Sequence, residues 1–203
     1  MSGSSVAAFL VHLVAMSAFV AGATTTVSAQ ETPVIPREVR LDIDRDGKLD
    51  LAKIIEMSDD SGDLLVYLGV GDGEPDPRRK PDFVKKNILA GTILAFESRG
   101  DNSLALATCV GCGARQSTEE TLVIVYRMRA FMVGGFDRSW DLNTHLASGE
   151  VDTTLGSCSV NFLTGEGRTS DSLEPDRPVK QRFKSIKLAD WSEETMPGIC
   201  QIP

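Results

Sequence analysis

The sequence is poor in the residues and motifs on which many hydrolytic and metal enzymes depend. It has two histidines, and because His12 lies in an apolar N-terminal stretch, His145 is the only one beyond it. A single histidine excludes a metal site built from several, and any Ser-His-Asp triad would have to use it. The G-x-S-x-G pattern of a nucleophilic serine is also absent. We therefore predict no catalytic residues and interpret His145 as a surface side chain.

Charge is missing from the first part of the chain. Residues 1–29 contain no Lys, Arg, Asp or Glu, and residues 6–23 are almost wholly apolar. The small residues Val27-Ser28-Ala29 resemble a cleavage site, so this pattern predicts a secretory signal peptide over residues 1–29. No later apolar run approaches the roughly 20 residues that span a bilayer. We expect an exported protein, periplasmic or secreted, with no transmembrane anchor after cleavage.

Long helical periodicity is absent as well, whereas short apolar and β-branched runs recur between turn signals. The predicted fold is a single, mainly antiparallel β domain over residues 30–203, a sheet or a sandwich, with little helix beyond a short one near residues 192–196. The predicted strands cover residues 64–68, 83–88, 92–96, 103–109, 121–126, 130–136, 151–155, 157–162 and 179–188.

Three of these segments carry more detailed predictions. Residues 64–68 are continuously apolar, which is typical of a strand buried on both faces. The segment Arg127-Met128-Arg129 separates two strong strand signals and predicts a hairpin. Gly134 and Gly135 predict a bulge or a close backbone approach in the second strand of that hairpin.

An excess of acidic residues gives a net charge of −8. Such a chain is a poor candidate for binding nucleic acid, because the phosphate backbone repels it. The basic cluster Arg78-Arg79-Lys80 is interpreted as a solvated surface. We therefore predict no nucleic-acid partner.

The most informative stretch is Asp42-Ile43-Asp44-Arg45-Asp46-Gly47-Lys48-Leu49-Asp50. Calcium takes six to eight oxygen ligands in irregular geometry, and Gly47 permits the sharp turn that gathers them. The predicted ligands are the side chains of Asp42, Asp44, Asp46 and Asp50 and the main-chain carbonyl of Lys48, completed by water. The alternative is an acidic turn without an ion, but four carboxylates this close would repel one another.

The flanks of this loop favour strands. Val39, Leu41 and Ile43 alternate with polar residues upstream, which indicates a strand. Downstream, the apolar residues fit a strand or a helix face, and we favour strand–loop–strand. An EF-hand is strongly disfavoured, because its twelfth position requires a bidentate glutamate and Lys53 stands there.

At every ligand position the loop resembles the calcium hairpin of FG-GAP (integrin-propeller) and VCBS-type repeats. That resemblance implies a calcium loop and not a propeller, which would need several copies. A second resemblance rests on two strings, residues 161–165 and the segment with Phe136, Arg138, Ser139 and Trp140. Together with the acidic loop, they are similar to a group of small exported bacterial proteins of unknown function. This implies an architecture and no activity.

The sequence contains four cysteines. An even number in an exported chain predicts two disulfides, with three possible pairings. Our first choice joins Cys109 to Cys112 and Cys158 to Cys200, and crossed pairings stay open. Cys109 and Cys112 also form a C-x-x-C motif, but thiol redox chemistry usually needs a helix N-terminus after it, and no helix signal follows. We favour a structural disulfide.

The sequence thus predicts a non-enzymatic, exported, calcium-binding β domain with a binding or envelope-structural role. The competing hypothesis is a periplasmic enzyme. It would be either a thiol oxidoreductase acting through Cys109 and Cys112 or a carboxylate-dependent hydrolase.

Overall fold

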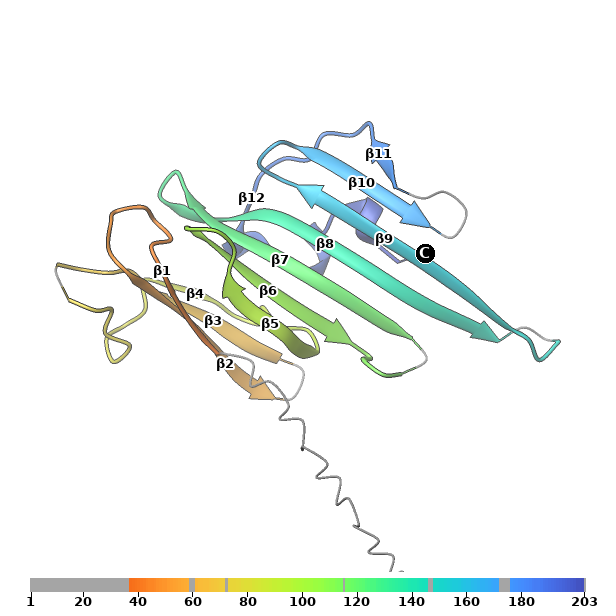
Figure 1. Ribbon diagram of the computed structural model, residues 1–203, viewed down its shortest axis with the longest axis horizontal. Helices are drawn as coiled ribbons and strands as arrows, with labels where there is room; N and C mark the ends of the chain where they lie inside the picture. The colour runs from red at the N-terminus through yellow and green to blue at the C-terminus, as the bar shows by residue number, and fades with distance from the viewer. Residues whose placement is uncertain are drawn as a thin grey trace, which may run out of the picture. The chain divides into compact units, whose positions relative to one another are not determined.

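A computed structural model describes residues 37–58, 61–71, 73–114, 116–145, 148–171 and 176–202 (Figure 1). All of them belong to one compact unit, Val34–Pro203. The predicted signal peptide, residues 1–29, lies outside the described residues, as does the side chain of His145. Within the described part the fold is mainly β, with two antiparallel sheets, which confirms the predicted fold class.

The first sheet has the order β1-β2-β3-β4 and contains the acidic loop. Its strands are β1 (Glu38–Leu41), β2 (Asp50–Ser58), β3 (Ser61–Tyr67) and β4 (Phe83–Lys85). Leu41 pairs with Asp50, so the loop does join two strands of a hairpin. In β3, Leu64 and Val66 are fully buried, whereas Leu65 is half-buried. The prediction of burial on both faces is therefore wrong for Leu65.

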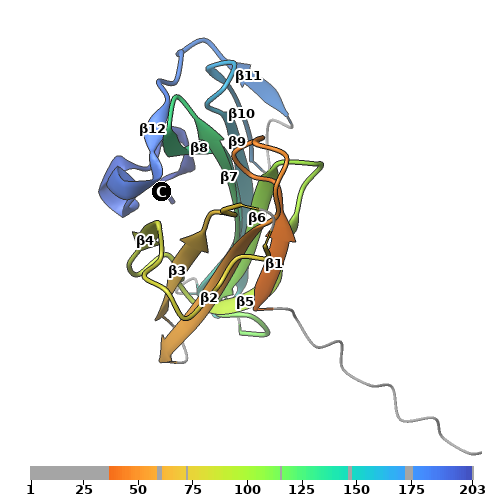
Figure 2. The ribbon, with the colours of Figure 1, turned by 90° about the vertical axis from the view of Figure 1, so that its left-hand side faces the viewer.

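The second sheet has the order β11-β10-β9-β8-β7-β6-β5, and β12 pairs with β8. Its strands are β5 (Thr92–Ser98), β6 (Ser103–Val110), β7 (Ser117–Arg127), β8 (Ala130–His145), β9 (Val151–Asn161), β10 (Glu166–Asp171), β11 (Arg177–Val179) and β12 (Ile186–Lys187). The predicted strand 179–188 is thus two short strands. Figure 2 shows this sheet beside the first one.

Strand β9 runs through Gly156, where the sequence suggested a break. A Cβ at Gly156 would lie 2.3 Å from Cζ2 of Trp140, so the glycine makes room for an indole ring. The β7–β8 hairpin is confirmed, with Met128 and Arg129 at its turn. Gly134 is the extra residue of a bulge, because Val123 pairs with Gly135 and Ile124 with Val133.

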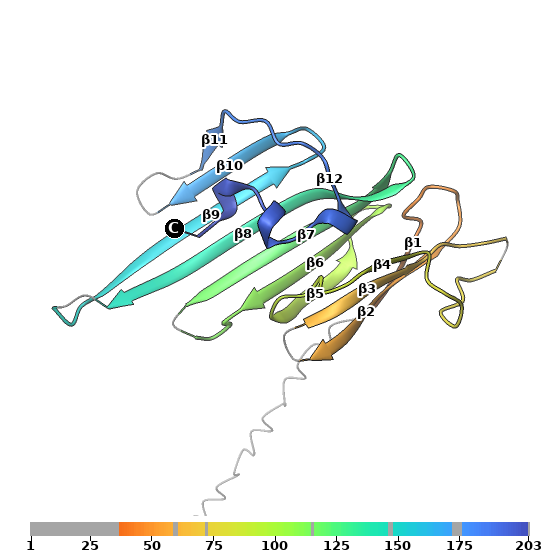
Figure 3. The ribbon, with the colours of Figure 1, turned by 180° about the vertical axis from the view of Figure 1, so that it is seen from behind.

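The C-terminal segment crosses the second sheet in three 3-10 turns, as Figure 3 shows. They are η1 (Leu188–Asp190), η2 (Glu193–Thr195) and η3 (Gly198–Cys200), and η2 lies in the predicted helical segment. Between η1 and η2, the Trp191 ring packs 5.0 Å from that of Phe136. Both sheets and this segment contribute side chains to one hydrophobic core.

Both disulfides of the first-choice pairing are present. The Cα atoms of Cys109 and Cys112 lie 5.7 Å apart, and those of Cys158 and Cys200 5.2 Å apart. Disulfides persist where the surroundings are oxidising, so they indicate a non-reducing, extracytoplasmic setting. Among the described residues, no helix is long and apolar enough to cross a membrane.

Candidate functional site

The acidic loop, residues 42–49, is folded by its own aspartates. The Asp42 carboxylate accepts hydrogen bonds from the main-chain N–H groups of Asp46 (3.1 Å) and Gly47 (3.0 Å). Arg45 and Gly47 have positive φ angles of 67° and 85°. The Arg45 guanidinium donates a 2.7 Å hydrogen bond to Asn102 of the loop before β6, which attaches the loop to the second sheet.

Three carboxylates converge at this loop. Each of Asp42, Asp44 and Asp50 has an oxygen within 4.8 Å of the others. Oxygens on opposite sides of a calcium ion lie about 5 Å apart, twice the metal–oxygen distance of about 2.5 Å. The separations and the all-oxygen donor set therefore fit a calcium ion, although acidic groups also gather at surfaces without one.

Asp46 and Lys48, the other two predicted ligands, interact with each other. The Asp46 Oδ1 atom accepts the main-chain N–H of Lys48 at 2.9 Å, and Oδ2 lies 3.3 Å from the Lys48 ammonium. The Asp46 carboxylate is therefore outside the cluster.

Asp50 lies at the base of the cluster and is completely buried. One of its oxygens accepts the N–H of Ile43 at 2.8 Å, and the other accepts the N–H of Gly69 at 2.7 Å. Burial raises the pKa of Asp50, and these two N–H groups oppose the shift. Because two lone pairs per oxygen are available, both hydrogen bonds leave acceptor capacity for a cation.

Gly69, two residues after β3, also belongs to the site. A Cβ at Gly69 would lie 2.5 Å from the Leu49 carbonyl oxygen and 2.9 Å from the Lys48 Cβ. Only glycine fits so close to the acidic loop. A glycine 19 residues after an aspartate carries no sequence signal for this contact.

Burial also raises the pKa of Asp44, and the charges of Asp46 and Asp42 raise it further. The cause is the same for both shifted groups, since neighbouring negative charge and lost hydration disfavour a carboxylate. A divalent cation would relieve both effects. The electrostatics of the loop therefore favour cation binding.

The segment between β3 and β4 carries a second group of acidic residues, Asp72, Glu74 and Asp76. Glu74 forms an ion pair with Arg40 at 2.9 Å, and Asp76 forms one with Arg78 at 2.9 Å. The hydrogen bonds from Arg78 lower the pKa of Asp76. Asp72 lies outside the described residues.

The C-x-x-C disulfide stands at the end of a strand. Cys109 is in β6 and almost fully buried, and a turn closed by the Ala114 N–H and the Gly111 carbonyl follows at 2.8 Å. The chain then enters β7 at Ser117, and no helix begins in the described residues between the two strands. Arg115, the nearest cation in sequence, is not among them. Among the described residues of this segment, there is thus no helix dipole of the kind that usually lowers a thiol pKa.

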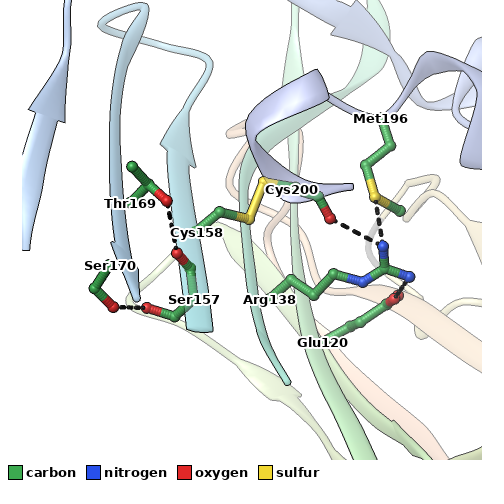
Figure 4. Close-up of a disulfide and its surroundings, with 8 residues drawn as sticks. All are labelled: Glu120, Arg138, Ser157, Cys158, Thr169, Ser170, Met196 and Cys200. Carbon is green, nitrogen blue, oxygen red and sulfur yellow. Dashed lines mark hydrogen bonds and ion pairs between the residues drawn. A yellow bond between two sulfur atoms is a disulfide. The ribbon is translucent and has the colours of Figure 1, made fainter. Parts of the chain in front are cut away.

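The second disulfide fastens the C-terminal segment to the sheet, together with Arg138 (Figure 4). The Arg138 guanidinium lies 2.7 Å from the Glu120 carboxylate, and it donates to the Cys200 carbonyl oxygen at 3.0 Å. Its side chain is only 11% exposed. Arg138 belongs to the string that resembles small exported proteins, and its role here is to hold the tail.

The sequence matches no known protein family, no curated protein and no solved structure. The interpretation of the acidic loop therefore rests on its own residues and geometry.

Proposed function

We propose that this protein is an exported, extracytoplasmic β domain that binds one calcium ion at the β1–β2 loop. Its role is binding or envelope structure rather than catalysis. The observation that carries the proposal is the approach of Asp42, Asp44 and Asp50 to within 4.8 Å, with one of these carboxylates completely buried.

In this proposal the Asp42, Asp44 and Asp50 side chains supply the first oxygens of the coordination shell. The FG-GAP-like spacing implies that the Lys48 carbonyl, water and Asp46 complete it, and Asp46 would have to turn away from the Lys48 ammonium to do so. When bound, calcium supplies two positive charges that neutralise the clustered carboxylates. The protein's own contribution is to hold the loop in register, through the hydrogen bonds from Ile43 and Gly69 to Asp50.

The ion would act as a structural lock. The loop joins two strands. Asp50, directly after it, accepts a hydrogen bond from Gly69, two residues beyond β3, and Arg45 donates one to Asn102, just before β6. A calcium ion would thus fix a point where both sheets are connected. At ten times the dissociation constant, mass action would add about 1.4 kcal/mol to the free energy of unfolding.

Neither enzymatic alternative is favoured by a specific observation. The Cys109–Cys112 disulfide lacks the helix N-terminus that activates redox cysteines, within the residues that the structure describes. A hydrolase would need a pair of carboxylates spaced about the scissile bond in a substrate cleft. Glu119 and Asp141 line one cavity of the second sheet, but no distance between their carboxylates supports that role.

Isothermal titration calorimetry of the purified protein tests the proposal. We expect one saturable calcium site per chain in the micromolar to millimolar range of extracellular modules, and weaker binding of magnesium, which requires a stricter octahedral geometry. An Asp42→Asn/Asp44→Asn variant should lose the site, and an Asp101→Asn control should keep it. Absence of saturable binding in the unaltered protein would refute the proposal.

A further inference from the structure

We propose a second binding site, independent of the calcium loop, for a small anionic molecule with an aromatic or branched apolar body. The site is a cavity of about 270 Å³ between the two sheets and the C-terminal segment. Six of the residues that line it carry the argument, namely Leu68, Phe83, Tyr126, Arg129, Phe131 and Lys187.

The apolar part of the cavity is aromatic. The Phe131 ring lies 4.6 Å from that of Phe83 and 5.0 Å from that of Tyr126. Phe131 is buried, whereas Phe83 and Tyr126 are only half-buried. Aromatic side chains that come from both sheets and keep part of their surface open provide a stacking surface for a flat or branched apolar group.

The rim of the cavity carries two positively charged side chains that form no ion pair with a described residue. The side chains of Arg129 and Lys187 make no hydrogen bond or ion pair with any residue that the structure describes. The one carboxylate in the lining, Asp82, is already neutralised by Arg79 at 2.7 Å. In a protein of net charge −8, two uncompensated cations beside an apolar cavity complement an anionic head group.

The backbone of the β7–β8 turn supports a functional role for Arg129. Met128 and Arg129 have φ angles of 51° and 59°, in the left-handed region where two-residue hairpin turns favour Asn-Gly. Each such residue costs roughly 1 kcal/mol relative to glycine. Met128 is 83% exposed, so burial of its side chain does not offset this cost. Strain of this kind at a cavity rim points to a side chain retained for binding.

Fluorescence titration with 8-anilinonaphthalene-1-sulfonate, an anionic aromatic probe, tests the site. The comparison probe is N-phenyl-1-naphthylamine, which has a similar apolar body and no charge. We expect one saturable site for the anionic probe, with its affinity lowered about tenfold by Arg129→Asn and again by Lys187→Gln, since a hydrogen bond to a charged group is lost each time. The neutral probe should bind the native protein and these two charge variants equally.

The variants separate a loss of probe affinity from a loss of protein stability. Arg129→Asn suits the turn better than the native residue, so it should raise the thermal midpoint while lowering affinity for the anionic probe. Arg127→Gln removes an exposed charge beside the same turn and should change neither titration. Phe83→Ala should weaken both probes.

Four results would overturn the proposal. The first is probe binding at several sites, and the second is an anionic-probe affinity that is unchanged in Arg129→Asn/Lys187→Gln. The third is a loss of anionic-probe affinity in Arg127→Gln equal to that in Arg129→Asn. The fourth is probe binding that falls as protein concentration rises. The last would mean that a second copy of the chain covers the cavity. All probe titrations are run at one fixed calcium concentration, so that failure here is separate from failure of the calcium proposal.

Discussion

The Asp50 carboxylate and the Gly69 main-chain N–H are joined by a 2.7 Å hydrogen bond across 19 residues of sequence. This bond ties the base of the acidic loop to the end of β3, where a side chain on Gly69 would collide with the loop. The loop is therefore a tertiary structure as well as a local turn.

Replacing Asp50 should destabilise the protein even without calcium. Asp50→Ala leaves the buried N–H groups of Ile43 and Gly69 without acceptors, at about 1–3 kcal/mol each. We expect the free energy of unfolding in urea, measured with chelator, to fall by about 2–4 kcal/mol. Asp101→Ala, an exposed control, should change it by less than about 0.5 kcal/mol. Equal stability of the Asp50 variant and the control would show that the buried carboxylate does not support the loop.

Gly69→Ala should distort the loop by overpacking. The new methyl group would lie 2.5 Å from the Leu49 carbonyl oxygen, and such clashes cost about 1–3 kcal/mol. Calcium affinity should fall with stability, because the displaced segment carries the N–H that positions Asp50. Gly73→Ala is the matched control, since a Cβ there meets nothing within 4 Å. Calorimetry and urea unfolding of both variants check this, and similar behaviour of the two would contradict it.

The stabilisation by calcium should weaken as the solution becomes acidic. Burial raises the pKa of both Asp44 and Asp50 above the ordinary value of 3.8. In the metal-free protein, the folded state therefore binds these protons more tightly than the unfolded chain, so acidification toward the raised pKa values favours folding. Calcium requires the ionised carboxylates.

The measurement for this prediction is the thermal midpoint with and without calcium, taken from pH 7 down to pH 4.5. The difference between the two midpoints should shrink continuously toward the acid end. A difference that stays constant over this range would mean that neither carboxylate takes part in binding.

The two disulfides should differ in their contribution to stability. In the chain-entropy model, the Cys158–Cys200 bond, with a sequence separation of 42, contributes about 4 kcal/mol, and the Cys109–Cys112 bond, with a separation of 3, about 1.6 kcal/mol. Replacing each pair with serines and measuring urea unfolding checks the order. A larger loss of stability on replacing Cys109 and Cys112 would contradict the predicted order. A thiol assay of the native protein should find no free thiol.

The sequence predicted the features that depend on local patterns. Alternation of Val39 and Leu41 with polar residues indicated the strand before the loop, and Gly134 indicated the bulge. Strand β10, Glu166–Asp171, escaped prediction because its polar sequence carries no apolar alternation. It is held by pairing with β9 and β11, and a Cβ at its Gly167 would lie 2.4 Å from the Phe183 ring.

In the acidic loop, too, some features follow from the local sequence and others from tertiary contacts. Spacing alone predicted a turn with converging carboxylates, and three of the four converge. The turning of Asp46 toward Lys48 depends on which neighbours compete for its oxygens. The contact with Gly69 depends on the packing of β3. Both are properties of the folded chain that spacing does not encode.

Thermal unfolding with calcium and then with chelator tests the central claim most directly, for the native protein and for Asp42→Asn/Asp44→Asn. The account predicts that calcium at ten times its dissociation constant raises the native midpoint by about 3–6 °C, from about 1.4 kcal/mol of added stability. The variant should not respond. A native midpoint that is the same with calcium and with chelator, or an equal rise in the variant, would contradict the claim that this loop is a calcium site.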